Sequence, residues 1–184
     1  MKYVSRAGEK LEHALCTFGI SVDGLYCADF GSNTGGFVDV LLTFGATKVY
    51  SIETGHGVLE WKLRQDPRVV VMEKVNAMHV SLPEKQDFIS IDTSWTKLEK
   101  VIPNALANLK PDGSIVALVK PHYESKPHML RKGKLQEDCI PEVLEGVKKA
   151  LQELNVEIIG EAESPIVGEK AKNKEFLLHL KPLV

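Results

Sequence analysis

The chain contains little cysteine: Cys16, Cys27 and Cys139 lie far apart in a sequence of 184 residues. Without a Cys-x-x-Cys pair, their spacing indicates neither a zinc site nor a disulfide framework, and it favours a reducing compartment. The six histidines likewise show no metal-ligand spacing, so we predict no metal site. No signal-peptide core follows the first residues, and no apolar run approaches the roughly 20 residues of a membrane span. We therefore expect a cytoplasmic protein without a membrane partner.

An excess of charge of one sign is also missing. The sequence has 23 Lys and Arg against 25 Asp and Glu, which gives a net charge of −2. This balance excludes a protein that is basic throughout, but basic residues can still gather locally. Residues 120–134 carry five Lys or Arg against one acid, and residues 169–174 carry three lysines against one acid. From charge alone, each stretch is either a solvated loop or a nucleic-acid contact.

Strand-like apolar runs alternate with helical periodicity along the whole chain, which is long enough for one domain with a sizeable core. This alternation predicts an α/β fold with a mostly parallel, seven-stranded sheet. The last two strands have no helix between them, so we expect an antiparallel strand near the C-terminus. We find no interdomain linker and expect a single domain over residues 1–184. The expected strands cover residues 25–30, 48–52, 69–72, 87–91, 114–119, 156–159 and 176–180.

Two local features bear on the ends of these elements. Ser5 is a suitable N-cap for a first helix, because its hydroxyl can accept a hydrogen bond from a free backbone N–H. The stretch from 121 to 134 shows no clear period and is long for a connection, which is typical of functional loops.

Residues 29–37 read Asp-Phe-Gly-Ser-Asn-Thr-Gly-Gly-Phe, directly after the apolar run 25–28. No Lys follows Gly36, which argues against a phosphate-binding P-loop, and Asn33 stands where the second glycine of a dinucleotide fingerprint would approach a pyrophosphate. An acid at the start of the turn favours a cationic, hydroxyl-bearing ligand without phosphate. S-adenosylmethionine fits that description. The alternative is a tight turn that needs glycine only for its positive φ angles.

Ligands of open α/β sheets bind beyond the carboxyl ends of the strands, which selects the candidate cofactor residues. Glu53 follows the second strand, where an acid can accept hydrogen bonds from ribose hydroxyls or be a simple surface acid. Asn76 follows the third strand and can read an adenine edge or serve as a turn residue. Asp92 and Lys120 end the fourth and fifth strands at the same rim. Asp29, at the end of the first strand, would also face the methionine ammonium. The other candidates of the turn after this strand are Gly31, Ser32, Asn33, Thr34, Gly35, Gly36 and Phe37.

Together with the glycine turn, five blocks make the sequence recognisable. They are Tyr-Val-Ser-Arg-Ala-Gly-Glu-Lys-Leu at 3–11, Trp-Lys-Leu-Arg-Gln-Asp-Pro-Arg-Val-Val-Val-Met at 61–72, Ile-Asp-Thr-Ser-Trp at 91–95, Ala-Leu-Val-Lys-Pro-His-Tyr-Glu at 117–124 and Asn-Lys-Glu-Phe-Leu-Leu-His-Leu at 173–180. The chain resembles the haemolysin-A (TlyA-type) branch of the FtsJ-like ribosomal RNA 2′-O-methyltransferases over nearly its whole length. The resemblance implies a Rossmann-like methyltransferase fold, S-adenosylmethionine as cofactor, and ribosomal RNA or a ribosomal subunit as partner.

The resemblance also implies a reaction centre, because the family uses a Lys-Asp-Lys-Glu tetrad that matches Lys10, Asp92, Lys120 and Glu175. Transfer to a ribose hydroxyl is an in-line displacement at the sulfonium methyl, and the hydroxyl must lose its proton. A lysine accepts that proton only when its amine is neutral. Burial and a nearby cation favour the neutral amine, whereas nearby carboxylates favour the charged form. Lys120 is therefore either the base or part of an orienting clamp. Without the resemblance, Lys10 reads as a solvated helix residue, and Glu175 as a partner of Lys174 or of a neighbouring loop lysine.

The sequence departs from the family pattern at two points. Full-length members carry an S4-like RNA-binding domain before the block at Tyr3, and we expect none in this chain. RNA contacts would then come from the loops at 121–134 and 169–174, from a partner, or from a part of a longer natural protein that this sequence lacks. Thr93, Trp95 and Thr96 stand where the branch has a Val-Ser-Phe-Ile type of run. Trp95 can stack on a base or pack in the core.

Two rival functions follow from the same residues. One is a methyltransferase that acts on another acceptor, because a shared fold does not determine the substrate. The other is a non-catalytic remnant that binds the cofactor or RNA. Membrane lysis, which the haemolysin name suggests, has no support from a transmembrane or long cationic amphipathic segment in this sequence.

Overall fold

The computed structural model describes residues 1–168 and 171–183 of the chain. Glu169 and Lys170, which belong to the basic stretch at 169–174, lie outside the described residues, as does Val184. Within the described ranges, none of the helices is both long enough and apolar enough to cross a bilayer.

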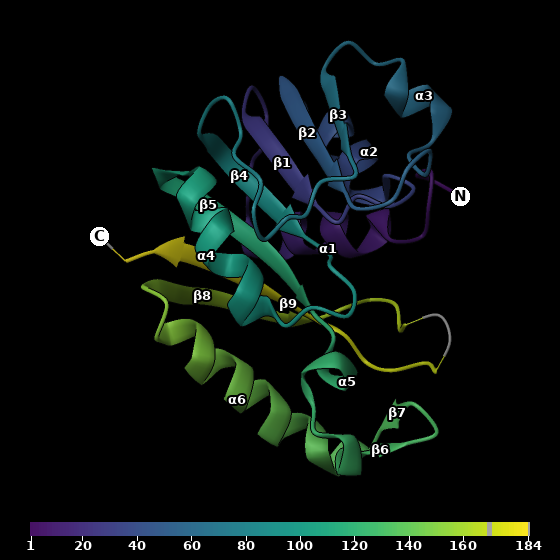
Figure 1. Cartoon of the computed structure of the whole chain (residues 1–184), viewed down its shortest axis with the longest axis vertical. Coiled ribbons are helices and arrows are strands. Elements are labelled where there is room, and N and C mark those ends of the chain that lie inside the picture. Colours follow the sequence, from purple (N-terminus) through teal and green to yellow (C-terminus); the bar gives the residue numbers. More distant parts are fainter. Residues whose placement is uncertain (169–170, 184) are drawn as a thin grey trace.

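A mixed α/β architecture is built around one large sheet (Figure 1). Its strands are β1 (Tyr26–Phe30), β2 (Lys48–Glu53), β3 (Val69–Glu73), β4 (Gln86–Ile91), β5 (Leu109–Val119), β8 (Val156–Glu163) and β9 (Phe176–Pro182). The helices are α1 (Gly8–Phe18), α2 (Gly36–Thr43), α3 (Trp61–Arg64), α4 (Leu98–Asn108), α5 (Pro121–Glu124) and α6 (Ile140–Gln152). Each predicted strand is present, although β5 and β8 are several residues longer than expected.

The sheet has seven strands in the order β3-β2-β1-β4-β5-β9-β8. The five strands from β3 to β5 run parallel, whereas β9 is antiparallel to both of its neighbours. This arrangement confirms the predicted fold class. Because parallel strands end at the same edge of a sheet, the residues that follow β1, β2, β4 and β5 all meet at one rim.

Helices cover both faces of the sheet, and the residue pattern of β5 shows why. Successive side chains of a strand point to opposite faces. Ile115 and Val119 pack in a cluster with α4 and α6, whereas Val116 and Leu118 pack in a second cluster with α1 and α2. Figure 1 shows these two helix layers on either side of the sheet. A strand that is apolar at every position is therefore buried on both sides.

The start of the first helix differs from the prediction. The residue at the N-cap of α1 is Ala7, which supplies no side-chain cap, so the expectation that Ser5 caps this helix is wrong. The Ser5 carbonyl oxygen accepts a hydrogen bond from the Gly8 N–H at 3.1 Å and forms a turn before the helix. The Ser5 side chain instead lines the cavity described in the next section.

The stretch without a clear period, residues 121–134, contains several short elements. After α5 come a 3₁₀ turn (η1, Pro127–Met129) and a small hairpin of β6 (Leu130–Arg131) and β7 (Lys134–Leu135); a second 3₁₀ turn (η2, Glu137–Cys139) leads into α6. Each element is too short to produce a recognisable repeat in the sequence. Met129 and Leu135 are buried and anchor the hairpin in a small apolar cluster with Val143 of α6.

Gly31, directly after β1, is the position where a side chain would do the most local damage. It has a φ of +89°, and a Cβ atom there would lie 2.6 Å from the carbonyl oxygen of Asp92. We expect Gly31→Ala to lower the free energy of unfolding by about 1–3 kcal/mol, because both the left-handed backbone and the neighbouring strand end oppose a side chain. Urea unfolding monitored by circular dichroism measures this change.

Gly146→Ala is the matched control for this substitution. Gly146 lies inside α6, and no described atom comes within 4 Å of the place where its Cβ would stand. There the same change should raise the free energy of unfolding by about 0.5–1 kcal/mol, since alanine is the better helix former. Equal stability of the Gly31→Ala and unaltered chains would contradict the tight approach of β1 to the end of β4.

Candidate active site

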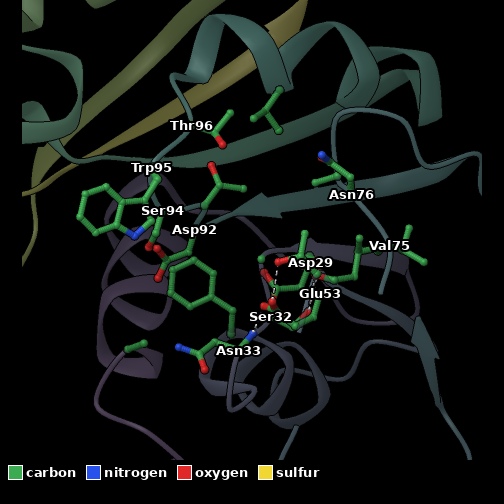
Figure 2. Close-up of a pocket in the computed structure, with 18 of the residues that line it drawn as sticks. Asp29, Ser32, Asn33, Glu53, Val75, Asn76, Asp92, Ser94, Trp95 and Thr96 are labelled. Carbon is green, nitrogen blue, oxygen red and sulfur yellow. Dashed lines mark hydrogen bonds between the residues drawn. The ribbon is translucent and has the colours of Figure 1, made fainter. Parts of the chain in front are cut away.

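A cavity of about 460 Å³ opens where the parallel strands end. This volume lies within the range of small-molecule sites, roughly 300–1,000 Å³. Figure 2 shows Asp92, Ser94 and Trp95 on one side of the cavity and Val75 and Asn76 on the other. Of the residues predicted from the sequence, those that line it are Asp29, Gly31, Ser32, Asn33, Thr34, Gly36, Phe37, Glu53, Asn76, Asp92 and Lys120.

Gly35 is the one predicted cofactor residue that does not line the cavity. It has a φ of +99°, and a Cβ atom there would run into the side chains of Leu59 and Leu63. At Gly36 a Cβ would collide with the Ser5 hydroxyl. The turn therefore needs glycine for packing at Gly35 and for close approach of the N-terminal segment at Gly36.

Asp29 is a buried carboxylate at the floor of the cavity, with 1% of its surface exposed. Burial raises its pKa to about 7, and the hydrogen bond that the Ser90 hydroxyl donates to Oδ1 at 2.8 Å opposes this rise. In the described part of the chain, Asp29 forms no ion pair. A buried acid of this kind is suited to a cationic ligand.

Glu53 is held in place by the turn on both sides of its carboxylate. Its Oε2 accepts a hydrogen bond from the Asn33 N–H at 2.9 Å, and its Oε1 accepts one from the Gly55 N–H at 2.8 Å. Oε1 also accepts a hydrogen bond from the Thr54 hydroxyl at 3.1 Å, so the second lone pair of Oε2 remains for a further donor such as a ribose hydroxyl. Glu53 is therefore an oriented acceptor at the cavity wall.

Asn76 is a turn residue whose side chain also lies at the cavity. Its Oδ1 accepts a hydrogen bond from the Met78 N–H at 2.9 Å, which makes it a turn residue. The same side chain also lines the cavity, with its amide group available to a ligand. An amide NH₂ group is a donor that can pair with an acceptor on a purine edge.

The four charged residues of the expected tetrad form two ion pairs. Lys120 Nζ lies 2.5 Å from Asp92 Oδ1 and also donates to the Ser94 hydroxyl at 3.2 Å. Lys10 Nζ lies 2.5 Å from Glu175 Oε2, and these two residues are only 7% and 4% exposed. Lys10 is thus not a solvated helix residue. Glu175 does not pair with its neighbour in the chain either, because Lys174 is paired with Glu163.

His122 is a residue of the site that the sequence analysis did not select, and the charges of both lysines of the tetrad affect it. Burial lowers its pKa, and the positive charges of Lys120 and Lys10 lower it further. The Nδ1 atom of His122 is buried, and it has no hydrogen-bond partner among the described residues. Its position two residues after Lys120 was the only signal in the sequence.

Trp95 is 82% exposed at the mouth of the cavity, so the expectation that it can pack in the core is wrong. Its ring packs against Tyr123, with the centroids 4.8 Å apart. Its backbone has a φ of 64°, which is uncommon for a bulky residue. The exposed ring belongs to the same cavity wall as Lys120 and Asp92.

The sequence reasoning missed other cavity residues because they flank the strand ends. Ser5 and Ala7 come from the N-terminal segment, which only the block at 3–11 could have indicated. The others are Thr54, Val75, Ala77, Met78, Thr93, Ser94, Thr96 and the β2 and α4 residues Ile52 and Val101. Within residues 1–168 and 171–183, no three His, Cys, Asp or Glu side chains gather as metal ligands.

Comparison with known families identifies relatives across the whole chain. The family model described as FtsJ-like methyltransferase matches residues 3–181. Hemolysin A of Brachyspira hyodysenteriae is 38% identical over an alignment that covers 97% of this chain and 77% of that protein. The 16S/23S rRNA (cytidine-2'-O)-methyltransferase TlyA of Mycobacterium tuberculosis is 37% identical, and its alignment covers 97% of this chain and 68% of TlyA.

Solved structures show the same relationship. A structure from Streptococcus thermophilus that carries a hemolysin name has a TM-score of 0.95 at 39% identity and covers 99% of this chain and 68% of its own. A structure from Listeria monocytogenes, named as an S-adenosylmethionine-dependent methyltransferase, has a TM-score of 0.69 at 15% identity and covers 97% of this chain and 99% of its own. At that identity the likeness shows a shared fold alone.

The raised pKa of Asp29 predicts how stability depends on pH. An aspartate in the unfolded chain titrates near 3.8, whereas folded Asp29 titrates near 7. Between these values the folded chain holds a proton that the unfolded chain has lost, so the Asp29 contribution to the free energy of unfolding falls as pH rises. This fall amounts to up to about 4 kcal/mol of unfolding free energy between pH 4 and 8, and it should be absent in Asp29→Asn. Urea unfolding across this pH range measures the difference.

Asp112→Asn is the control, because Asp112 is an exposed carboxylate in β5. It should leave the pH dependence of unfolding unchanged. If Asp29→Asn and Asp112→Asn follow the same pH profile as the unaltered chain, the carboxyl group of Asp29 does not hold its proton in the folded state.

Proposed function

The chain belongs to the FtsJ-like methyltransferase family, and we propose that it transfers a methyl group from S-adenosylmethionine to a ribose 2′-hydroxyl of ribosomal RNA. One observation carries the proposal. The Asp92–Lys120 ion pair lies in the wall of the same cavity that begins at the glycine turn. A cofactor in the cavity and an acceptor at its mouth would therefore meet at this pair. The class of acceptor is suggested by the name of the Mycobacterium tuberculosis relative.

The residues of the cavity fit S-adenosylmethionine, which supplies a methyl group on a positively charged sulfur when bound. Asp29 would face the methionine ammonium, because it is a buried acid without a cation of its own. Glu53 would accept the ribose hydroxyls, and the Asn76 amide would meet the adenine edge. The residues that would complete the wall around the cofactor are Gly31, Ser32, Asn33, Thr34, Gly36 and Phe37.

The proposed reaction centre consists of Lys10, Asp92, Lys120 and Glu175. Each amine is held by a carboxylate 2.5 Å away, so both ammonium groups have defined positions. This arrangement favours a clamp that holds the acceptor hydroxyl in line with the methyl group. Good alignment of reacting groups can contribute about 7–11 kcal/mol to lowering the barrier. The proton of the hydroxyl would leave toward the Asp92–Lys120 pair, which lies at the cavity wall.

Trp95 and Tyr123 add a stacking surface beside this centre. The exposed indole faces the cavity mouth and is supported from behind by the Tyr123 ring. Aromatic side chains of this kind stack on bases of single-stranded nucleic acid, with about 1–3 kcal/mol for each base. We propose that Trp95 contacts the base of the nucleotide whose ribose is methylated. This contact would favour RNA over a small-molecule acceptor.

Substitution of Lys120 tests the proposed reaction centre. We expect Lys120→Ala to reduce the rate of methyl transfer to ribosomal RNA by at least about 100-fold, because the hydroxyl loses its clamp or base. Lys120→Arg separates these roles: a clamp retains part of its activity, since arginine keeps the charge, whereas a base is lost as completely as in alanine. Transfer of radiolabelled methyl groups to ribosomal subunits, followed by mass mapping of the RNA, measures both variants.

Lys100→Ala is the control, because Lys100 is an exposed lysine of α4 outside the cavity. If Lys120→Ala transfers methyl groups as fast as the unaltered chain, the tetrad is excluded. If the unaltered chain itself transfers no methyl group to ribosomal subunits, the protein acts on another acceptor or has a non-catalytic role. Calorimetric titration with S-adenosylmethionine distinguishes these, since a chain with another acceptor still binds the cofactor.

A further inference from the structure

Two basic loops that are far apart in the sequence come together in the structure. One is the β6–β7 hairpin, residues 130–135, and the other is the segment 171–174 that leads into β9 (Figure 1). A buried amide joins them. The Asn173 side chain donates from Nδ2 to the Gly133 carbonyl at 3.0 Å, and its Oδ1 accepts from the Leu135 N–H at 2.9 Å. Asn173 is 5% exposed, so this bond pair is shielded from water.

The joined loops present unpaired positive charge. Four of their side chains are basic and exposed, and we call them the basic platform: Arg131, Lys132, Lys134 and Lys172. Within the described residues, none of the four takes part in an ion pair. Lys174 is not part of the platform, because it is paired with Glu163 at 3.4 Å. The platform is thus a local concentration of charge on a chain whose net charge is −2.

A short, hydrogen-bonded path connects the platform to the proposed reaction centre. Asn173 lies two residues before Glu175, whose carboxylate holds Lys10 at 2.5 Å. The Asn173 carbonyl oxygen also accepts a hydrogen bond from the Gly168 N–H at 2.8 Å, which adds a further fixed contact at Asn173. The position of the hairpin relative to Lys10 is therefore set by buried contacts rather than by a flexible linker.

We propose that the basic platform binds the phosphate backbone of the RNA substrate and sets its register on the enzyme. This inference rests on the proposed function for the class of substrate. Separate lysine and arginine side chains on two loop tips suit phosphates that follow one another along a strand. Phosphate contacts give affinity and position without reading sequence. Held at a constant distance from Lys10, they would bring one ribose to the Asp92–Lys120 pair.

The backbone of the platform offers a substitution that removes charge without harming the fold. Lys132 and Gly133 have φ angles of 50° and 79° and form the two-residue turn of the hairpin, and Lys172 has a φ of 53°. Asparagine tolerates this left-handed conformation better than lysine. The variants Lys132→Asn and Lys172→Asn should therefore fold at least as well as the unaltered chain while losing one positive charge each.

Binding of the full chain to a fluorescein-labelled single-stranded RNA of about 20 nucleotides tests the platform by fluorescence anisotropy. We expect the double variant Lys132→Asn/Lys172→Asn to bind at least about tenfold more weakly at about 50 mM salt. The slope of log K against log salt concentration should shrink by about 1.4, since each lost phosphate contact removes about 0.7 for a single strand. The affinity for S-adenosylmethionine should stay the same, because neither lysine lines the cavity.

Lys74→Asn is the matched control. Lys74 is an exposed lysine with a φ of 57° that follows β3, at the opposite edge of the sheet from β8 and β9. It should leave RNA affinity and the salt slope unchanged. RNA binding by the double variant equal to that of the unaltered chain would overturn the proposal, as would the absence of RNA binding by the unaltered chain. A chain that binds RNA through the platform but transfers no methyl group would support the platform and contradict the proposed function.

Discussion

Lys10 and Glu175 are 165 residues apart in the chain, and their charged ends meet inside the protein. A buried ion pair must compensate the loss of hydration of both charges, and removal of one partner is strongly destabilising, by about 3–5 kcal/mol. Such a pair is weak evidence for stability as such, since apolar residues of similar volume often do as well. Here it joins α1 to Glu175, which directly precedes β9, and so holds segments near both ends of the chain together. The Asn173 link to the β6–β7 hairpin lies two residues before this pair.

The glycine turn packs against three parts of the protein and also forms part of the cavity wall. Gly31 lies against the backbone of Asp92, Gly35 against two leucines and Gly36 against Ser5. The turn is thus enclosed by β4, by α3 and by the N-terminal segment, and the cavity occupies the remaining side. The sequence offered a structural and a ligand-binding explanation as alternatives. In the structure, packing against the protein accounts for all three glycines, and two of them, Gly31 and Gly36, also line the cavity.

The acceptor side of the site is built from segments without regular periodicity. Trp95 follows β4, Tyr123 and His122 belong to the short helix α5, and the hairpin at 130–135 is bonded to the loop before β9 through Asn173. These segments supply aromatic faces and positive charge, the two features that bind nucleic-acid bases and phosphates. They lie next to the ion pairs of Lys10 and Lys120. The proposed cofactor and RNA surfaces therefore meet at one edge of the sheet.

The sequence by itself determined the α/β fold, the strand positions and the residues at the strand ends. This was possible because apolar runs indicate buried strands, and the alternation of such runs with helical periodicity indicates the order of the elements. The rule that ligands bind beyond the carboxyl ends of parallel strands likewise predicted a cavity wall at Asp29, Glu53 and Asp92. Lys10 and Glu175 came only from the resemblance to a family, since nothing local in either segment indicates its partner. Ser5, His122 and the Asn173 link were decided by the tertiary structure, because they depend on which distant segments the strand order brings side by side, and no local period carries that information.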